Sequence, residues 1–231
     1  MNFMLMGLED MITFILFVVA IVVVIGAQAY IGRAFKEYRT TKINRNITGF
    51  EAARRILDHN GLNKVHVVEV KGELSDHYDP TQKVVRLSTP IFHESSIAAV
   101  AIAAHEVGHA LQDKESYIFM KIRAALVPVV SLISYLGYFA LFIAIFAGIT
   151  QYLMIGILIL LATFLFQIVT LPVEFDASKR ANQQLLELGL IDVSEKEKVK
   201  AMLNAAALTY VAALVATLLQ IIRLFLMTRR R

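Results

Sequence analysis

The stretch MITFILFVVAIVVVIGAQAYI, residues 11–31, contains no charged side chain. A hydrocarbon core about 30 Å thick needs about 20 helical residues, so this run is long enough to cross a bilayer. Two more uncharged runs and a fourth run that contains Arg223 lie further along the chain, at residues 124–148, 150–173 and 205–227. The sequence therefore predicts a mostly α-helical integral membrane protein with three to four transmembrane helices.

The composition of the 231 residues limits the chemistry. The chain is 57% hydrophobic, has a mean hydropathy of +0.61 and contains no cysteine. Disulfides and thiolate-held metals are excluded, so any metal ion must be bound by His, Asp or Glu. The net charge is +4, but the basic residues flank the apolar runs, as in the positive-inside pattern. We therefore expect contact with a lipid bilayer and no nucleic-acid binding.

Five regions follow from this pattern. We expect a transmembrane anchor, a cytoplasmic segment with a small β element, a transmembrane hairpin, a helix, and a last apolar helix that either spans or packs into the bundle, at residues 1–31, 32–123, 124–173, 174–204 and 205–231. The acidic Glu9 and Asp10 argue against a cleaved signal peptide, whose start is basic. The short link at residues 148–150 makes the two hairpin helices antiparallel.

The polar segment begins with an amphipathic helix. Thr48 is a suitable N-cap, apolar residues recur after it at helical spacing, and Gly61 ends it. Residues 64–72 are rich in valine and predict a strand, and a second short strand is expected at residues 83–88. The second strand is a candidate edge for pairing with an extended substrate.

The next helix, capped by Ser95 or Ser96, contains IAAHEVGHALQD, residues 102–113. Positions i and i+4 share a helix face, so His105 and His109 can bind one Zn²⁺. Glu106 lies about a third of a turn away, where it can act as general base toward a zinc-bound water. Two buried imidazoles and a carboxylate without a partner would cost several kcal/mol, which disfavours a purely structural role.

A catalytic zinc needs a third protein ligand. Four histidines precede the motif and are candidates: His59, His66, His77 and His93. The other candidate is Glu174, on a helix expected to start after Pro172, with Asp176 on the opposite face. The hairpin returns the chain to the same side of the membrane, which brings Glu174 near the motif. Glu115 is turned away from the ligand face.

At these residues the chain resembles membrane-embedded gluzincin metallopeptidases of the HtpX-like and CAAX-prenyl types. The motifs GFEAARRIL, DHYDP, VVRLS, HEVGHALQ and LPVEFDASKRA make it more similar to the YugP-like neutral zinc metallopeptidases of bacteria, over nearly its whole length. The resemblance implies zinc, a third ligand at Glu174 and a multi-pass protein of the bacterial plasma membrane. Ser178 stands where the HtpX-like pattern has Asp, so Ser178 or Asp176 is expected to orient a ligand.

The predicted function is a zinc endopeptidase that cleaves membrane-associated or misfolded polypeptide on the cytoplasmic side, without a specified oligomeric state. Tyr210 and His77 are candidate hydrogen-bond donors to the oxyanion, although a tyrosine in an apolar run is equally typical of a membrane interface. The alternative is a catalytically inactive zinc-binding scaffold or chaperone-like protein. The intact Glu106 favours the enzyme, because a structural zinc site needs ligands and no base.

Overall fold

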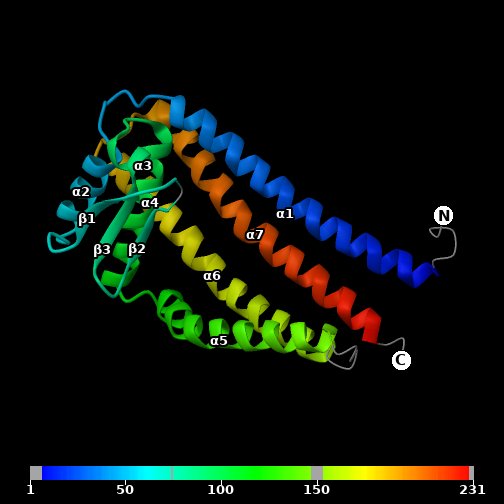
Figure 1. Ribbon diagram of the computed structural model, residues 1–231. Helices are drawn as coiled ribbons and strands as arrows, with labels where there is room; N and C mark the ends of the chain where they lie inside the picture. The colour runs from blue at the N-terminus through cyan, green and yellow to red at the C-terminus, as the bar shows by residue number, and fades with distance from the viewer. Residues whose placement is uncertain (1–6, 74, 147–152, 229–231) are drawn as a thin grey trace. The chain divides into compact units, whose positions relative to one another are not determined.

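The computed structural model describes residues 7–73, 75–146 and 153–228. It is mostly helical, with a three-stranded sheet (Figure 1). The helices are α1 (Leu8–Thr40), α2 (Gly49–His59), α3 (Thr89–His93), α4 (Ile97–Lys114), α5 (Ile118–Phe146), α6 (Leu153–Glu187) and α7 (Lys196–Thr228), with a short 3-10 helix at Val193–Glu195. The strands are β1 (His66–Val70), β2 (His77–Asp79) and β3 (Val84–Ser88).

Four stretches are long and apolar enough to cross a membrane: Leu8–Thr40, Ile118–Gly137, Met154–Glu187 and Val193–Thr228. The last of these includes the run around Arg223, which is therefore a fourth candidate span by length and composition. The expected short link at residues 148–150 lies outside the described residues. The expected mostly helical fold with a small sheet is confirmed, and its long apolar helices are candidate membrane spans.

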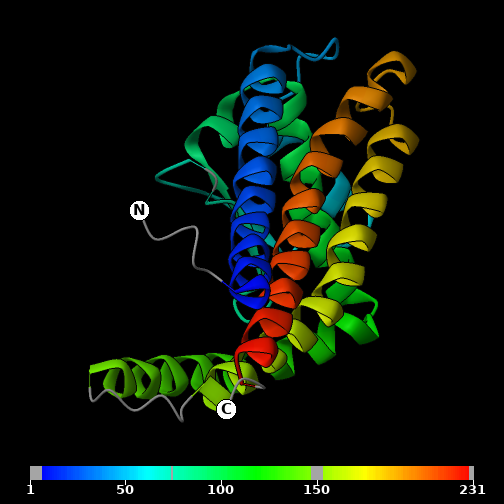
Figure 2. The ribbon, with the colours of Figure 1, turned by 90° about the vertical axis from the view of Figure 1, so that its right-hand side faces the viewer.

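The described residues form two compact units. The first is drawn from the described residues 7–28, 122–146, 153–171 and 209–228. In it α1 and α7 lie side by side and antiparallel (Figure 2), and the Arg223 guanidinium lies 4.6 Å from the centre of the Phe17 ring. Large apolar side chains on these helices are exposed, Val22 and Ile25 by more than half, as expected of helices that face lipid.

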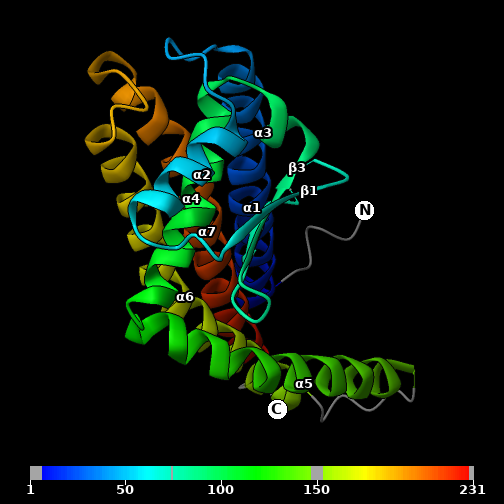
Figure 3. The same ribbon diagram turned by 90° about the vertical axis from the view of Figure 1, so that its left-hand side faces the viewer.

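The second unit comprises residues 29–121 and 172–208. Here α2 and α3 pack on α4 beside the sheet (Figure 3), and the core is built largely from small and aliphatic side chains of α2 and α4. The helix α2 begins as predicted, because Thr48 and Glu51 form a reciprocal capping box. It ends at His59, and Gly61, two residues further on, has a φ of +70° that suits glycine and stops the helix.

The sheet order is β1-β3-β2, with β3 parallel to β1 and antiparallel to β2. β3 is therefore the central strand, and the expectation that residues 83–88 form a free edge for substrate is wrong. The sequence pattern missed β2, which has only three residues. The edge strands of the described sheet are β1 and β2.

The helix α6 corrects a second expectation. Pro172 lies inside one continuous helix from Leu153 to Glu187 and does not start a new one. A proline in a helix removes one backbone hydrogen bond, a loss that helices emerging from a membrane tolerate when neighbours support them. Glu174 therefore lies on the same helix as the apolar run before it.

Candidate metal centre

The helix α4 presents the two motif histidines side by side. Ser96 caps the helix by accepting the N–H of Ala99, as predicted. The rings of His105 and His109 lie edge to face, with centres 4.8 Å apart. Their side chains are only 15% and 11% exposed, so both imidazoles lie near the protein interior. The i, i+4 spacing thus gives the shared face expected of two ligands.

Glu174 completes the group. Its Oε2 lies 3.3 Å from His105 Nε2 and 3.7 Å from His109 Nε2, and its side chain is 3% exposed. Among the described residues, these three could hold a metal ion, with ligand atoms all within 4.8 Å of one another. Ligand atoms bound to Zn²⁺ at about 2.0–2.1 Å in a tetrahedron are about 3.3 Å apart, so the group fits zinc.

The other candidates for third ligand are not in this group. His93 Nε2 instead lies 3.1 Å from the Glu69 carboxylate. Glu115 is bound to Arg180 at 2.7 Å. His77, on β2, is exposed, with Nδ1 2.8 Å from the carbonyl oxygen of Ser75. Tyr210 lies on α7 in the first unit and is 38% exposed, so its role as oxyanion donor stays a prediction.

A close approach of two helices brings the ligands together. A Cβ on Gly108 would lie 2.5 Å from the carbonyl oxygen of Ala177, which is closer than any real contact. Glycine in mid-helix costs about 1 kcal/mol relative to alanine. Here it lets α6 approach α4 closely enough for Glu174 to reach both histidines.

Gly108→Val is therefore expected to destabilise the protein by about 1–3 kcal/mol and to weaken metal binding, because the new side chain pushes α6 away from α4. Thermal unfolding in detergent and zinc content after dialysis measure the two effects. Gly32→Val is the matched control, since a Cβ there meets nothing within 4 Å. Equal losses in both variants would show that helix propensity alone, and not the close approach, is responsible.

Glu106 is 8% exposed and is held by the sheet. Its Oε2 accepts the backbone N–H of Tyr78 on β2 at 2.9 Å. The Tyr78 hydroxyl in turn donates to Asp113 Oδ2 at 2.7 Å, which ties β2 to α4. Burial, followed by this hydrogen bond, raises the pKa of Tyr78, so the phenol stays protonated and keeps donating. Tyr78 gave no sequence signal, because the contact joins two distant segments.

The outer nitrogens of both histidines are also occupied. Ser178 Oγ lies 3.1 Å from His105 Nδ1, and Gln112 Oε1 lies 3.0 Å from His109 Nδ1. Gln112 also donates to Asp176 at 2.8 Å, so Asp176 turns toward α4, and the expectation that it lies on the opposite face from Glu174 is wrong. A glutamine three residues after a ligand histidine was the available sequence signal, since i and i+3 are neighbours on a helix.

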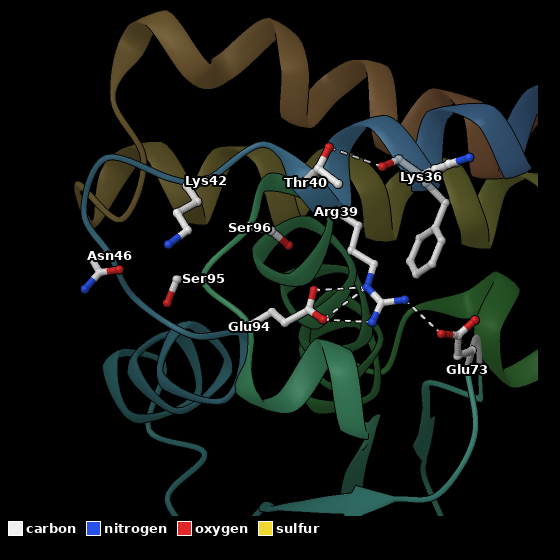
Figure 4. Close-up of a pocket in the computed structure, with 10 residues that line it drawn as sticks. Lys36, Arg39, Thr40, Lys42, Asn46, Glu73, Glu94, Ser95 and Ser96 are labelled. Atoms are coloured by element: carbon white, nitrogen blue, oxygen red, sulfur yellow. Dashed lines mark hydrogen bonds and ion pairs between the residues drawn. The ribbon is translucent and has the colours of Figure 1, made fainter.

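A separate cavity of about 800 Å³ lies where α1 ends and α4 begins (Figure 4). In it Arg39 binds Glu94 at 2.9 Å and Glu73 at 2.8 Å. Both carboxylates are thus already paired with a cation. The backbone N–H of Ile97 donates to Thr41 at 2.9 Å, so this region anchors the first turn of α4.

Comparisons with known proteins agree with this geometry. A family model described as "putative neutral zinc metallopeptidase" matches residues 13–229. The "putative membrane protease YugP" of Bacillus subtilis (strain 168) is 44% identical over 197 residues, which cover 85% of this chain and 88% of that protein. No solved structure matches.

Proposed function

The chain belongs to the family of putative neutral zinc metallopeptidases, and from this premise we propose that it is a membrane-embedded zinc endopeptidase with Glu106 as general base. The observation that supports the proposal most is the convergence of His105, His109 and Glu174 beside a buried Glu106. Two imidazoles and one carboxylate leave a fourth zinc position for water or substrate. The proposal is tested by zinc-dependent cleavage of an unfolded polypeptide, and by loss of that cleavage when Glu106 is replaced.

The roles of the residues follow from their positions. His105 and His109 would hold the metal through Nε2, and Glu174 would hold it through a carboxylate oxygen. Zn²⁺ bound there would supply a Lewis acid and lower the pKa of a bound water to about 7. Glu106 accepts the proton as the water oxygen adds to the peptide carbonyl, and then delivers it to the leaving amine. The Tyr78 N–H holds one oxygen of Glu106, which leaves the other oxygen for the water.

The scaffold alternative has no comparable support. A structural zinc site needs ligands but no adjacent base. Here a carboxylate next to a ligand histidine is buried and oriented by a backbone N–H. Burying a carboxylate is costly unless it is hydrogen-bonded, so this arrangement favours an enzyme.

Substrate is proposed to bind along the outer edge of β2. The Tyr78 N–H donates to Glu106 and therefore points away from β3. The backbone groups of successive residues in a strand point alternately to its two sides, so Tyr78 faces the outer edge of β2. Because the Tyr78 N–H is occupied by Glu106, an extended polypeptide is proposed to pair with this edge through backbone groups other than that N–H. This places the scissile bond of a strand-like segment next to the base, and it selects for unfolded or membrane-associated polypeptide over folded domains.

The site is proposed to face the cytoplasm of a bacterial plasma membrane, because basic residues of the second unit flank the apolar runs. These residues are Arg33, Lys36, Arg39, Lys42, Arg45, Lys121, Lys179 and Arg180.

Single cysteines test this topology cleanly, because the parent chain has none. We expect Lys64→Cys and Val193→Cys to resist an impermeant thiol reagent added to intact cells and to react after the membrane is permeabilised. Both positions are exposed, Val193 by 82%, so burial cannot explain resistance. Labelling of either residue from outside intact cells would contradict the cytoplasmic placement.

A further inference from the structure

Gln112 is a fully buried polar residue that makes three hydrogen bonds at the metal centre. It is 0% exposed and lies one turn after His109 on α4. Its Oε1 is 3.0 Å from His109 Nδ1. Its Nε2 donates to the carbonyl oxygen of Val173 and to Asp176 Oδ2, each at 2.8 Å. Every polar group of this amide therefore has a partner, as buried polar groups require.

The partners allow only one orientation of the amide. A backbone carbonyl can only accept, and the Asp176 carboxylate, which is ion-paired with Arg180 at 2.6 Å, also accepts. The NH₂ group of Gln112 must therefore face α6, and its carbonyl must face His109. A carbonyl accepts only, so His109 Nδ1 must carry the proton and donate. The lone pair of the ring is then left on Nε2, the atom that faces Glu174.

We propose that Gln112 is a positioning residue that sets the tautomer and ring orientation of His109 for metal binding. The inference rests on the proposed zinc site and deepens it. Arg180, Asp176, Gln112 and His109 form one chain of hydrogen bonds from α6 to the ligand. The Gln112 amide is itself oriented by the α6 backbone, through the carbonyl of Val173 next to the ligand Glu174. Two ligands on different helices are thus positioned relative to each other.

His105 is held differently. Its Nδ1 faces the hydroxyl of Ser178, at 3.1 Å. A hydroxyl can donate or accept, so it does not select a tautomer. We therefore expect the loss of Gln112 to matter more than the loss of Ser178.

The test measures zinc affinity by competition with a chelator, using full-length protein in detergent. Gln112→Met keeps the length of the side chain and removes both polar groups. Zinc affinity is expected to fall about 10–100-fold, the usual effect of losing a partner of a metal-bound histidine. The visible spectrum of the cobalt-substituted protein should also change, because the His109 ring is free to rotate. Gln183→Met, on an exposed glutamine of α6, is the matched control and should leave both readouts unchanged.

A reversed pair tests the hydrogen-bond logic directly and keeps the proposal falsifiable if Gln112→Met folds poorly. Gln112→Glu alone places a carboxylate against Asp176 and should weaken zinc binding. Adding Asp176→Asn supplies an amide donor to that carboxylate, which still accepts from His109, so the double variant should recover part of the affinity, although the carbonyl of Val173 stays without its donor. A purely structural role would predict additive losses in the double variant.

The outcomes separate this inference from the proposed function. If the parent binds zinc and Gln112→Met binds it equally tightly with an unchanged cobalt spectrum, the positioning role is wrong and the zinc site stands. Additive losses in the double variant also overturn the positioning role. If the parent chain itself binds no zinc, the proposed function is wrong.

Discussion

We expect Glu106→Gln to lower the rate of proteolysis by at least about 10²–10⁴-fold, while the protein keeps its zinc. The substitution preserves the size of the side chain and both histidines, so the ligand set is intact. The amide cannot accept the proton of the attacking water, and base catalysis of this kind contributes about 10²–10⁴ to the rate. The measurement is the cleavage rate of an unfolded polypeptide by purified parent and variant, with zinc content determined on the same samples.

Two controls accompany this comparison. Removing zinc from the parent with a chelator should stop cleavage, and added zinc should restore it, whereas added zinc should not rescue Glu106→Gln. Glu115→Gln is a matched carboxylate change at the end of the same helix; it loses an exposed ion pair with Arg180 and should cleave at the parent rate. Cleavage by Glu106→Gln at the parent rate would eliminate the proposed mechanism and favour the scaffold alternative.

We expect the Glu174→Gln variant to lose most of its bound zinc and, as a consequence, its proteolytic activity. Glu174 is 2% exposed and its carboxylate lies between the two imidazoles. Glutamine keeps the shape but removes the charge and leaves only a weak oxygen ligand. Removing only a hydrogen-bond partner of a ligand lowers metal affinity by about 10–100-fold, and the fall in zinc affinity in Glu174→Gln should be larger than this. Metal content after dialysis measures the effect.

Asp176→Asn is the matched control, two residues along the same helix. It should keep most of its zinc, because the carbonyl of Val173 still orients the Gln112 amide when the aspartate is lost. Stoichiometric zinc in Glu174→Gln together with loss of zinc in Asp176→Asn would mean that the wrong carboxylate has been assigned as ligand.

The local parts of the site could be predicted from the sequence. The spacing of His105 and His109 puts both side chains on one helix face, and this relation holds in any helix. Thr48 and Ser96 cap their helices as predicted, because capping depends on residues three positions apart. The mid-helix Gly108 indicates a close approach of another backbone, because glycine there costs about 1 kcal/mol relative to alanine. The long uncharged runs predicted the membrane helices from bilayer thickness alone.

The choice among candidate third ligands needed more than local pattern. Four histidines and Glu174 were all compatible with zinc chemistry, and a returning hairpin favoured Glu174. Only the structure brings the Glu174 carboxylate within 3.3 Å of His105 Nε2. Pro172 was misread because a proline often marks a helix start, whereas packing carries α6 through it.

What the sequence determined by itself is thus the apolar runs long enough to span a membrane and the helix that carries His105, Glu106 and His109 in a pattern typical of zinc sites. The tertiary structure alone decided that β3 is central, that β2 holds Glu106 through Tyr78, and that Gln112 links His109 to α6. The physical reason is range. Helix periodicity and capping act between residues three or four positions apart, whereas the position of a backbone N–H or a buried amide depends on chain segments brought together by packing of the core.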